Sequence, residues 1–375
     1  MGDSDIEWTD KTWPITVGCE RTAPKGSKQS GCGDASGGGC YAELSVAQVN
    51  RCQLGAGRPA PYADLIKLVK RGDKTVPRWT GTARFFADRL AQPLRWRKPA
   101  RIFVSSQSDL FHKDITNEQL AAVFGVMAAT PRHTYQILTK RSDRMSEWFR
   151  WVAVRENQGR AMFPDDDPDW RIGQMLAAAL SRHAGIDGRV PGSAATGWED
   201  FDPRRRPWPL PNVWLGVSVE NQAAAAERIP HLLATPAAVR FISAEPLLGP
   251  VNLRHLDADA AGHASWCQID ALTGRQTHMG RPFRDVGARL DWVIAGAESG
   301  TGARPCDVAW LRSLRDQCKA AAVPFFLKQA VDPGGPAFGE PVITAGPGSK
   351  RKGRGLIGAP YLDGRQHLEM PEAGR

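Results

Sequence analysis

The sequence has no long hydrophobic run, and its first residues argue against a secretory signal. The 375-residue chain contains no uninterrupted apolar stretch of about 18 residues, the length that a membrane-spanning helix needs. Its first residues, Met1–Asp5, are mostly polar and include two acidic side chains, whereas a secretory signal opens on positive charge. We therefore expect a cytoplasmic protein with no membrane partner.

Histidine is absent from the part of the chain where cysteine is concentrated. Cys19, Cys32, Cys40 and Cys52 lie within 34 residues, and the first histidine of the chain is His112. Without a secretory signal, such a cluster indicates metal or redox chemistry rather than a disulfide framework. A set of thiolates without histidine favours zinc, copper(I) or an iron–sulfur cluster.

Acidic side chains are scarce in one segment. The whole chain carries 49 Lys and Arg against 40 Asp and Glu, which is a formal net charge of +9. From Lys67 to Arg101, eleven basic residues stand against only two acidic ones, Asp73 and Asp88. Such a segment is either a solvated basic face or a contact surface for nucleic acid, and the sequence leaves both open.

The hydrophobic residues of the chain suffice for a large core, and they recur in a pattern of alternating strands and helices. Hydrophobic residues make up 42% and charged residues 24% of the chain, which is ordinary for a globular protein. Short apolar runs read as strands, and helical patterns such as Asn117–Ala129 and Val308–Ala321 stand between several of them. The predicted strands are Trp13–Val17, Arg78–Phe85, Arg101–Ser105, Thr134–Leu138, Val213–Val217, Val239–Ser243, Trp292–Ala295 and Pro324–Leu327. Alternating strands and helices predict an α/β fold, a (β/α) barrel of TIM type that is complete or partly open.

Three segments depart from this pattern. Residues 148–211 and 252–289 read as insertions in loops, because loops longer than about 15 residues are uncommon inside a compact domain. Residues 336–375 are rich in Gly, Pro and basic side chains, and we expect a flexible tail on the surface there. The predicted barrel with its loop insertions therefore comprises residues 1–335.

Polar side chains follow most of the predicted strands. In a (β/α) barrel the carboxyl ends of the strands share one rim, where active sites are built. One such residue alone is more often a turn or helix cap, but several strand ends that converge indicate a functional site. These residues are Ser106, Asp109, Lys140, Ser218, Glu220, Glu245, Glu298 and Lys328.

Three of the cysteines fall on the loop after the first predicted strand. Cys19, Cys32 and Cys40 flank Gly-rich stretches, and a helix is expected to begin near Tyr41. A closed zinc site needs a fourth ligand, which would be Cys52 or Glu43. An iron–sulfur cluster held by three cysteines instead leaves one iron open, and free buried thiols are the remaining alternative. The sequence assigns no further role to Cys52, Cys267, Cys306 and Cys318.

A series of short motifs runs in order along the chain. The motifs are Ile6-Glu7-Trp8-Thr9-Asp10, Gly18-Cys19, Cys40-Tyr41-Ala42-Glu43, Ser108-Asp109-Leu110-Phe111-His112, Gln136–Arg141, Asn212–Glu220, Arg240–Pro250, Asp291–Gly300 and Pro324–Gln329. In these motifs the chain resembles the phage gp-thirty-seven/gp-sixty-eight family, whose uncharacterised members carry a three-cysteine motif.

This resemblance implies a cofactor and a partner. The three-cysteine motif of the family is similar to that of radical S-adenosylmethionine enzymes, whose barrel carries its cluster loop after the first strand. The resemblance therefore implies a 4Fe-4S cluster on Cys19, Cys32 and Cys40, with S-adenosylmethionine as cofactor. Some members are encoded beside a dedicated three-Cys-motif partner protein, which implies a protein partner. The cysteine spacing here is longer than the Cys-x3-Cys-x2-Cys of such enzymes, and Ala297 stands where the family commonly has a second glycine.

The sequence thus predicts a radical S-adenosylmethionine-type iron–sulfur enzyme that acts on a nucleic-acid base or a related substrate. The candidate catalytic residues are Glu245, Glu298, Lys140 and Asp109. The candidate cofactor-binding residues are Tyr41, Ser106, Ser218, Glu220 and Lys328. One alternative is a zinc-stabilised, non-catalytic protein that binds nucleic acid through the basic face at Lys67–Arg101. Another is a barrel hydrolase with a metal at Asp109, Glu245 and Glu298.

Overall fold

The computed structural model of the protein describes most of the chain. The described residues are 4, 6–23, 32, 40–162, 168–184, 207–257, 267–278, 281–284, 287–299, 303–331, 343–352 and 356–372. Among the helices of this part of the chain, none is both long and apolar enough to span a bilayer.

The central element is a nine-stranded sheet with the order β1-β6-β7-β8-β9-β14-β15-β18-β17. Its parallel strands are β1 (Lys11–Trp13), β6 (Arg101–Val104), β7 (Thr134–Thr139), β8 (Val213–Ser218), β9 (Val239–Ala244), β14 (Trp292–Gly296) and β15 (Phe325–Val331). Two antiparallel strands, β18 (Leu356–Gly358) and β17 (Lys350–Arg351), extend the sheet beyond β15. The α/β class and the mostly parallel sheet are confirmed. The edge strands β1 and β17 do not pair with each other within the described residues, so the curved sheet is compatible with a partly open barrel, the second of the two predicted forms.

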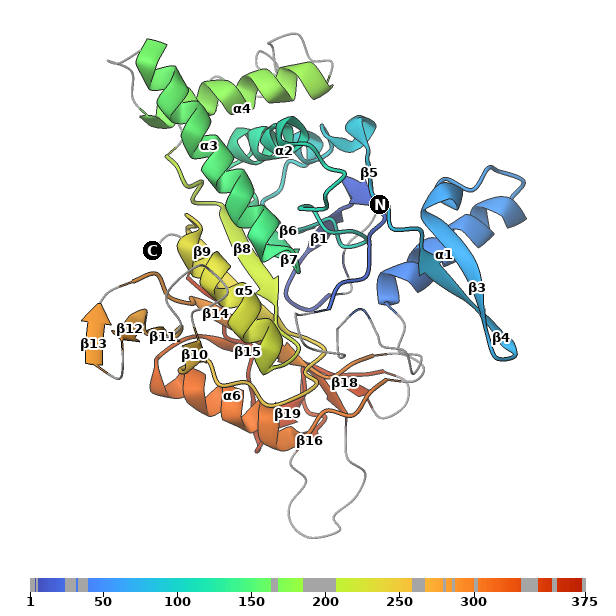
Figure 1. Ribbon diagram of the computed structural model, residues 1–375. Coiled ribbons are helices and arrows are strands. Elements are labelled where there is room, and N and C mark those ends of the chain that lie inside the picture. The colour runs from blue at the N-terminus through green and yellow to red at the C-terminus, as the bar shows by residue number, and fades with distance from the viewer. Residues whose placement is uncertain are drawn as a thin grey trace.

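Helices fill most of the crossovers between the parallel strands (Figure 1). They are α2 (Asn117–Ala129), α3 (Ser142–Met162), α4 (Pro168–Ala184), α5 (Gln222–Ala234) and α6 (Val308–Ala320). Local sequence sets where several of them begin. The Thr116 side chain caps α2 in a capping box with Gln119, and Asn221 and Asp307 cap α5 and α6. The two helices that the periodicity predicts, at 117–129 and 308–321, are confirmed to within a residue.

The predicted strand Arg78–Phe85 is wrong. Residues Lys74–Trp79 form β4, which pairs with β3 (Ile66–Arg71) in a separate hairpin, and β5 (Arg84–Phe85) pairs with β2 (Thr16–Val17). The chain turns between β4 and β5 at Gly81, whose φ of +98° suits glycine. The predicted strand Trp13–Val17 is likewise divided into β1 and β2, because Pro14 lacks the N–H that would continue the ladder. Short helical turns join these strands to the rest, namely η1 (Ala63–Leu65), η2 (Ala87–Arg89) and η3 (Pro93–Arg95).

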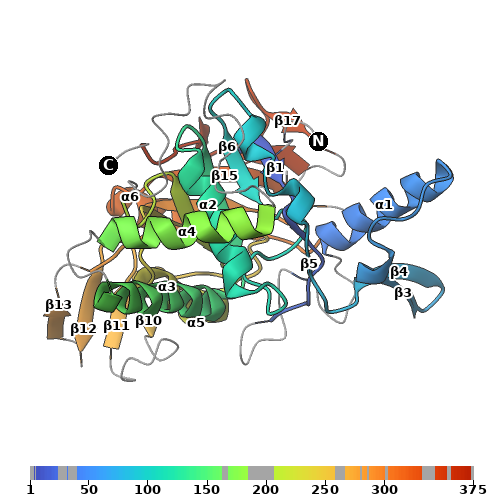
Figure 2. The ribbon, with the colours of Figure 1, turned by 90° about the horizontal axis from the view of Figure 1, so that it is seen from above.

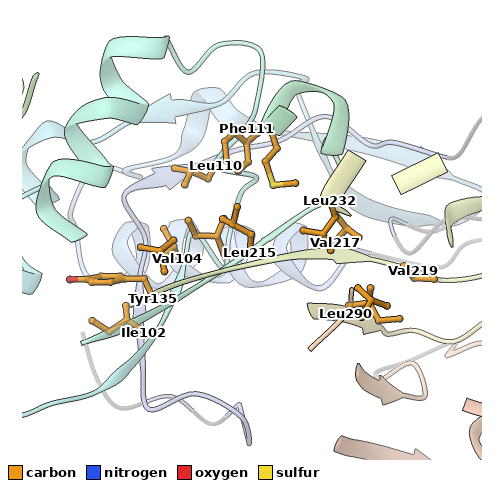
Figure 3. Packing of buried hydrophobic residues seen from close by; sticks show 14 of the residues in the cluster. Ile102, Val104, Leu110, Phe111, Tyr135, Leu215, Val217, Val219, Leu232 and Leu290 are labelled. Carbon is orange, nitrogen blue, oxygen red and sulfur yellow. The ribbon is translucent and has the colours of Figure 1, made fainter. Parts of the chain in front are cut away.

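Alternate residues of the parallel strands face two different cores. On the outer face, apolar side chains such as Ile102, Val104, Leu215 and Val217 pack against the helices (Figure 3). On the inner face, the neighbours of these residues along the strands form a second cluster that is mostly aromatic. This aromatic cluster contains Trp8, Phe103, Trp214, Val239, Phe241, Trp292, Ile294 and Phe326. The inside of the curved sheet is therefore filled by side chains, and a ligand site is left to its rim.

Close packing inside the sheet explains one glycine. A Cβ at Gly216 of β8 would lie 2.4 Å from the Phe241 ring on the adjacent strand β9. The N-terminal segment crosses this inner face, where the rings of Trp8 and Phe103 have centroids 4.9 Å apart. Such aromatic pairs contribute about 1 kcal/mol beyond the burial of their area.

The predicted insertions contain regular structure in their described parts. Residues 148–211 include most of α3 and all of α4, with Trp148 fully buried against the core. Residues 252–289 form an antiparallel sheet in place of a crossover helix. Its strands are β10 (Leu256–Asp257), β11 (Cys267–Asp270), β12 (Arg275–His278) and β13 (Arg281–Arg284).

The segment 336–375 does not form a flexible tail in its described part. Strands β17 and β18 extend the main sheet, and β16 (Ile343–Thr344), β19 (Tyr361–Leu362) and β20 (Arg365–Gln366) form a small sheet of their own. Ile343, Ile357 and Leu362 are fully buried. These apolar residues anchor a segment whose glycine, proline and basic residues suggest disorder when composition alone is considered.

One part of the chain stands apart from the sheet and its helices. Helix α1 (Tyr41–Gly55), η1 and the β3–β4 hairpin lie side by side at one edge of the molecule (Figures 1 and 2). We call residues 40–81 the basic lobe. Its small core includes Ala42, Val46, Tyr62, Leu65 and Trp79. Cys40 and Trp79 therefore lie where this lobe meets the main sheet.

Candidate functional site

A pocket of about 320 Å³ lies at the carboxyl ends of the parallel strands. Every site residue predicted from the sequence lines this pocket except Glu220. The predicted residues on its wall are Cys19, Cys32, Cys40, Tyr41, Ser106, Asp109, Lys140, Ser218, Glu245, Glu298 and Lys328. Residues of the inner aromatic face, including Trp8 and Phe103, form its apolar floor. Strand ends that are far apart in the sequence thus converge on one cavity, as the parallel topology requires.

Three cysteines, Cys19, Cys32 and Cys40, line the pocket. Cys19 follows β2 through Gly18, whose φ of +97° and close approach to the Thr82 carbonyl leave no room for a side chain. Cys40 directly precedes α1, and its carbonyl accepts a hydrogen bond from the backbone N–H of Glu43 at 3.1 Å. Cys32 lies between them in the sequence and is buried. The three thiols therefore line one cavity despite their long spacing in the sequence.

The surroundings of Cys19 and Cys40 favour the neutral form of both thiols. Desolvation, together with the charge of Asp109, raises the pKa of Cys19 to about 12, although the nearby Arg141 opposes the shift. Desolvation and the charge of Cys32 also raise the pKa of Cys40. Three thiolates cannot share this space without positive charge between them. A bound cationic centre would supply that charge, and the donor set suits a metal that prefers sulfur.

No fourth protein ligand is at hand at the positions that the sequence suggests. Cys52 lies twelve residues after Cys40 along α1, about 18 Å away at the helical rise of 1.5 Å per residue, and it is exposed. Glu43 is buried and already engaged, since it binds Arg21 at 2.6 Å, Arg78 at 3.3 Å and the Trp79 backbone N–H at 3.1 Å. Neither residue can close a zinc site at the three cysteines.

A single ion has no ready site in the described part of the chain, where no three His, Cys, Asp or Glu side chains form a group that could hold one. In an iron–sulfur cluster each thiolate binds a different iron, so the three sulfurs need not converge on one point.

Asp109 and Arg141 form the wall beside Cys19. Asp109 is 5% exposed and accepts hydrogen bonds from two backbone N–H groups at 3.0 Å and from the Thr139 hydroxyl at 2.7 Å. Arg141 Nη1 lies 3.3 Å from Asp109 Oδ2 and 3.6 Å from Cys19 Sγ. Asp109, predicted to be catalytic, thus has its oxygens occupied and positions the guanidinium against the first cysteine.

Glu245 and Lys328 form a second charged pair across the pocket. Lys328 Nζ lies 2.7 and 2.9 Å from the two carboxylate oxygens of Glu245, and the Gln329 amide donates to the same carboxylate at 2.9 Å. Behind them Lys352 Nζ contacts Gln329 Oε1 at 3.2 Å and Glu7 at 2.6 Å. Lys352, directly after β17, therefore links the C-terminal segment to the residues that hold Glu245.

Glu298 is paired as well. The backbone N–H and the guanidinium of Arg304 donate to both of its oxygens at 2.7–2.9 Å. Because Asp109, Glu245 and Glu298 each bind their own cation, they do not form a free carboxylate set for a metal. This pairing argues against the hydrolase alternative.

Glu220 lies behind the pocket instead of on its wall. It is fully buried between the Lys140 ammonium and Arg228, whose Nη1 lies 2.8 Å from Glu220 Oε2. Burial raises the pKa of Glu220, but the two cations more than offset this and lower it to about 2. Glu220 therefore holds Lys140 at the pocket and does not itself reach a ligand.

Several residues of the site are missing from the sequence prediction. Arg141 directly follows Lys140 at the end of β7, and this second basic residue is the available signal for it. Arg304 lies six residues after Glu298 in an irregular segment, and no motif marks it. The sequence pattern indicates that Trp8 and Phe103 are core residues. The structure confirms this and shows that both also line the floor of the cavity.

The raised thiol pKa values predict slow alkylation of metal-free protein. At about pH 7.5 iodoacetamide should label Cys52, which is exposed, at least ten times faster than Cys19. The rate at Cys19 should then rise about tenfold for each pH unit, because the thiolate fraction rises by that factor below the pKa. Peptide mass spectrometry measures both rates in one sample. Arg141→Gln should slow Cys19 further and leave Cys52 unchanged, whereas equal rates at pH 7.5 would contradict the assignment.

Comparisons with known proteins give one match. The model of a protein family described as "Protein of unknown function (DUF5131)" matches residues 3–371. No curated protein and no solved structure matches the chain.

Proposed function

We propose, for a chain that belongs to the DUF5131 family, a radical S-adenosylmethionine-type enzyme that acts on a nucleic-acid base or a related substrate. The observation that carries the proposal is the set of three thiols on one pocket at the carboxyl ends of a parallel sheet. A partly open parallel sheet with its cysteine loop after the first strand agrees with a barrel of the radical-enzyme type. The three-Cys-motif partner protein stays a prediction.

Cys19, Cys32 and Cys40 are the residues that would hold a 4Fe-4S cluster. When bound, such a cluster with one open iron delivers an electron to the sulfonium of S-adenosylmethionine. Arg141 places positive charge 3.6 Å from the Cys19 sulfur, which stabilises its thiolate. Hydrogen bonds to ligand sulfurs also tune the reduction potential of such a centre.

The rest of the pocket can bind and orient a polar ligand on an apolar floor. Lys140 and Lys328 offer ammonium groups and Glu245 and Glu298 offer carboxylates, each held by a partner so that its direction is fixed. The Tyr41 hydroxyl donates to the Ser106 carbonyl, which fixes the ring at the mouth of the cavity. Prepositioned polar groups of this kind bind without the cost of ordering them.

The zinc-stabilised binding protein is the weaker candidate. It needs a closed four-ligand site, and the geometry removes both Cys52 and Glu43 as the fourth ligand. A three-thiol site with an open position instead suits chemistry in which another molecule binds the metal.

The experiment that tests the proposal uses anaerobically reconstituted, dithionite-reduced protein. The electron paramagnetic resonance signal of the reduced cluster should change shape when S-adenosylmethionine is added, because the sulfonium compound binds at the open iron. S-adenosylhomocysteine, which lacks the sulfonium, is the matched control and should produce a different and smaller change. A cluster signal that is the same with and without S-adenosylmethionine would contradict the proposal.

A further inference from the structure

The basic lobe carries a large share of the positive charge of the protein. Residues 41–81 contain seven Lys and Arg and three Asp and Glu, a net charge of 7 − 3 = +4 out of +9 for the whole chain. Two of its charged residues, Arg78 and Glu43, contact each other inside the lobe. The remaining cations therefore determine how its surface interacts.

Several of these cations are exposed and lack an acidic partner. No ion pair to them occurs in the part of the chain that the structure describes, and they come from both α1 and the hairpin. They are Arg51, Arg58, Lys67, Lys70 and Lys74. The exposed cations at the other end of the basic segment, Arg95, Arg97 and Lys98, lie near η3, outside the lobe. The basic stretch of the sequence is thus divided between two places in the fold.

The lobe is continuous with the pocket. Tyr41, Ala42 and Trp79, all residues of the lobe, line the cavity. From Tyr41 an exposed stripe runs along α1 through Leu44, Gln48 and Arg51 at helical spacing, with Tyr41 58% and Leu44 53% exposed. The stripe leads from the mouth of the pocket toward the far end of α1.

We propose that the basic lobe is the docking surface for a single-stranded nucleic acid, with Tyr41 stacking on the nucleotide at the mouth of the pocket. Unpaired lysines and arginines contact the phosphates, and one aromatic ring supplies a stacking platform that tolerates any base. This inference rests on the proposed function. It extends that function by naming a single-stranded nucleic acid, instead of a free base, as the substrate.

The choice of a single strand follows from the position of the cavity. A base inside a duplex cannot enter a pocket unless it leaves the stack, whereas a single strand presents its bases directly. A membrane is the less suitable partner, because the exposed stripe of α1 mixes Tyr, Leu, Gln and Arg and offers no continuous apolar face.

The test compares two variants of equal charge change in the full-length protein. Lys67, Lys70 and Lys74 are changed to alanine in one variant, and Arg95, Arg97 and Lys98 in the control. The probe is a fluorescein-labelled single-stranded DNA of about 20 nucleotides, and anisotropy gives its dissociation constant over a range of salt concentrations. Circular dichroism and the thermal midpoint establish that both variants are folded.

The lobe variant should bind about 10- to 100-fold more weakly near 0.1 M salt, and its salt slope should fall by about 2, since each phosphate contact of a single strand contributes about 0.7. The control should bind like the unmodified protein. Tyr41→Leu should weaken binding without changing the slope. Equal losses in both triple variants, tighter binding of the matching duplex, or competition by vesicles of anionic phospholipid would overturn the proposal.

These binding measurements need neither the cluster nor S-adenosylmethionine. If the lobe variant behaves as expected but no cluster forms, the docking surface stands and the enzymatic proposal fails. If the cluster forms and responds to S-adenosylmethionine while the lobe variant binds normally, the docking proposal alone fails.

Discussion

Cys40→Ser is expected to lower the iron content of reconstituted protein to background. The substitution removes one of the three thiols that line the pocket among the described residues, and neither Cys52 nor Glu43 can replace it. Cys40 stands at the N-cap position of α1 without a side-chain capping bond, and serine is a favourable N-cap residue, so the helix should form as before. Iron and acid-labile sulfide analysis, together with the visible absorption of the cluster, measures the effect.

Cys52→Ser is the matched control for this loss. It is the same substitution on the same helix, about 18 Å from Cys40 by the helical rise, at an exposed position. Its iron content should equal that of the unmodified protein. Full iron content in Cys40→Ser, or equal losses in both variants, would remove the three-cysteine site from the account.

Glu220→Gln is expected to lower the free energy of unfolding by about 3 to 5 kcal/mol, since removing one partner of a buried ion pair leaves an uncompensated charge. Here that charge is the Arg228 guanidinium, which is 1% exposed and whose other contact is the Ser218 carbonyl at 2.8 Å. The variant keeps the shape of the side chain and loses only its negative charge. Urea titration followed by circular dichroism gives the difference.

The comparison for this variant is Lys113→Gln, which breaks an exposed pair. Lys113 Nζ lies 3.0 Å from Glu20, and the two side chains are 63% and 48% exposed. Exposed pairs of this kind contribute less than about 1 kcal/mol. If Glu220→Gln lowers the free energy of unfolding no more than Lys113→Gln does, the buried group of Lys140, Glu220 and Arg228 does not stabilise this side of the pocket.

The same carboxylate predicts a dependence of stability on pH. The pKa of Glu220 is lowered from 4.5 to about 2 in the folded protein, so the unfolded chain takes up its proton first as the pH falls. The stabilisation is therefore fully present above about pH 4.5 and is lost as the pH falls toward 2. Glu220→Gln should lack this part of the acid dependence, while Lys113→Gln should keep it.

Residues at strand ends were predictable from the sequence because parallel topology places them together. Ser218, Glu245 and Lys328 each follow an apolar run. A sheet of parallel strands brings such positions to one edge, whether the sheet is open or closes into a barrel. The position of Cys19 was also predictable, although it follows β2, a short strand outside the parallel sheet, instead of the first strand of that sheet.

What the sequence could not supply is how the charges are paired and how some loops fold. Asp109 reads as a free carboxylate at a strand end, but three other donors and Arg141 occupy it. Glu220, like Glu245, follows an apolar strand in the sequence, but it does not line the pocket. The β3–β4 hairpin depends on a turn at Gly72, whose φ is +55°, and on packing against α1, neither of which a strand pattern encodes. Burial of Ile357 and Leu362 likewise outweighs the composition of the C-terminal segment.

The most direct test of the central claim is the iron, acid-labile sulfide and zinc content of the unmodified protein purified without oxygen. The account predicts iron and sulfide in equal amounts, about four of each per chain, and both absent when Cys19, Cys32 and Cys40 are changed together to serine. One zinc per chain with no iron would contradict it, and the three thiols would then belong to a structural site with a fourth ligand still to be found.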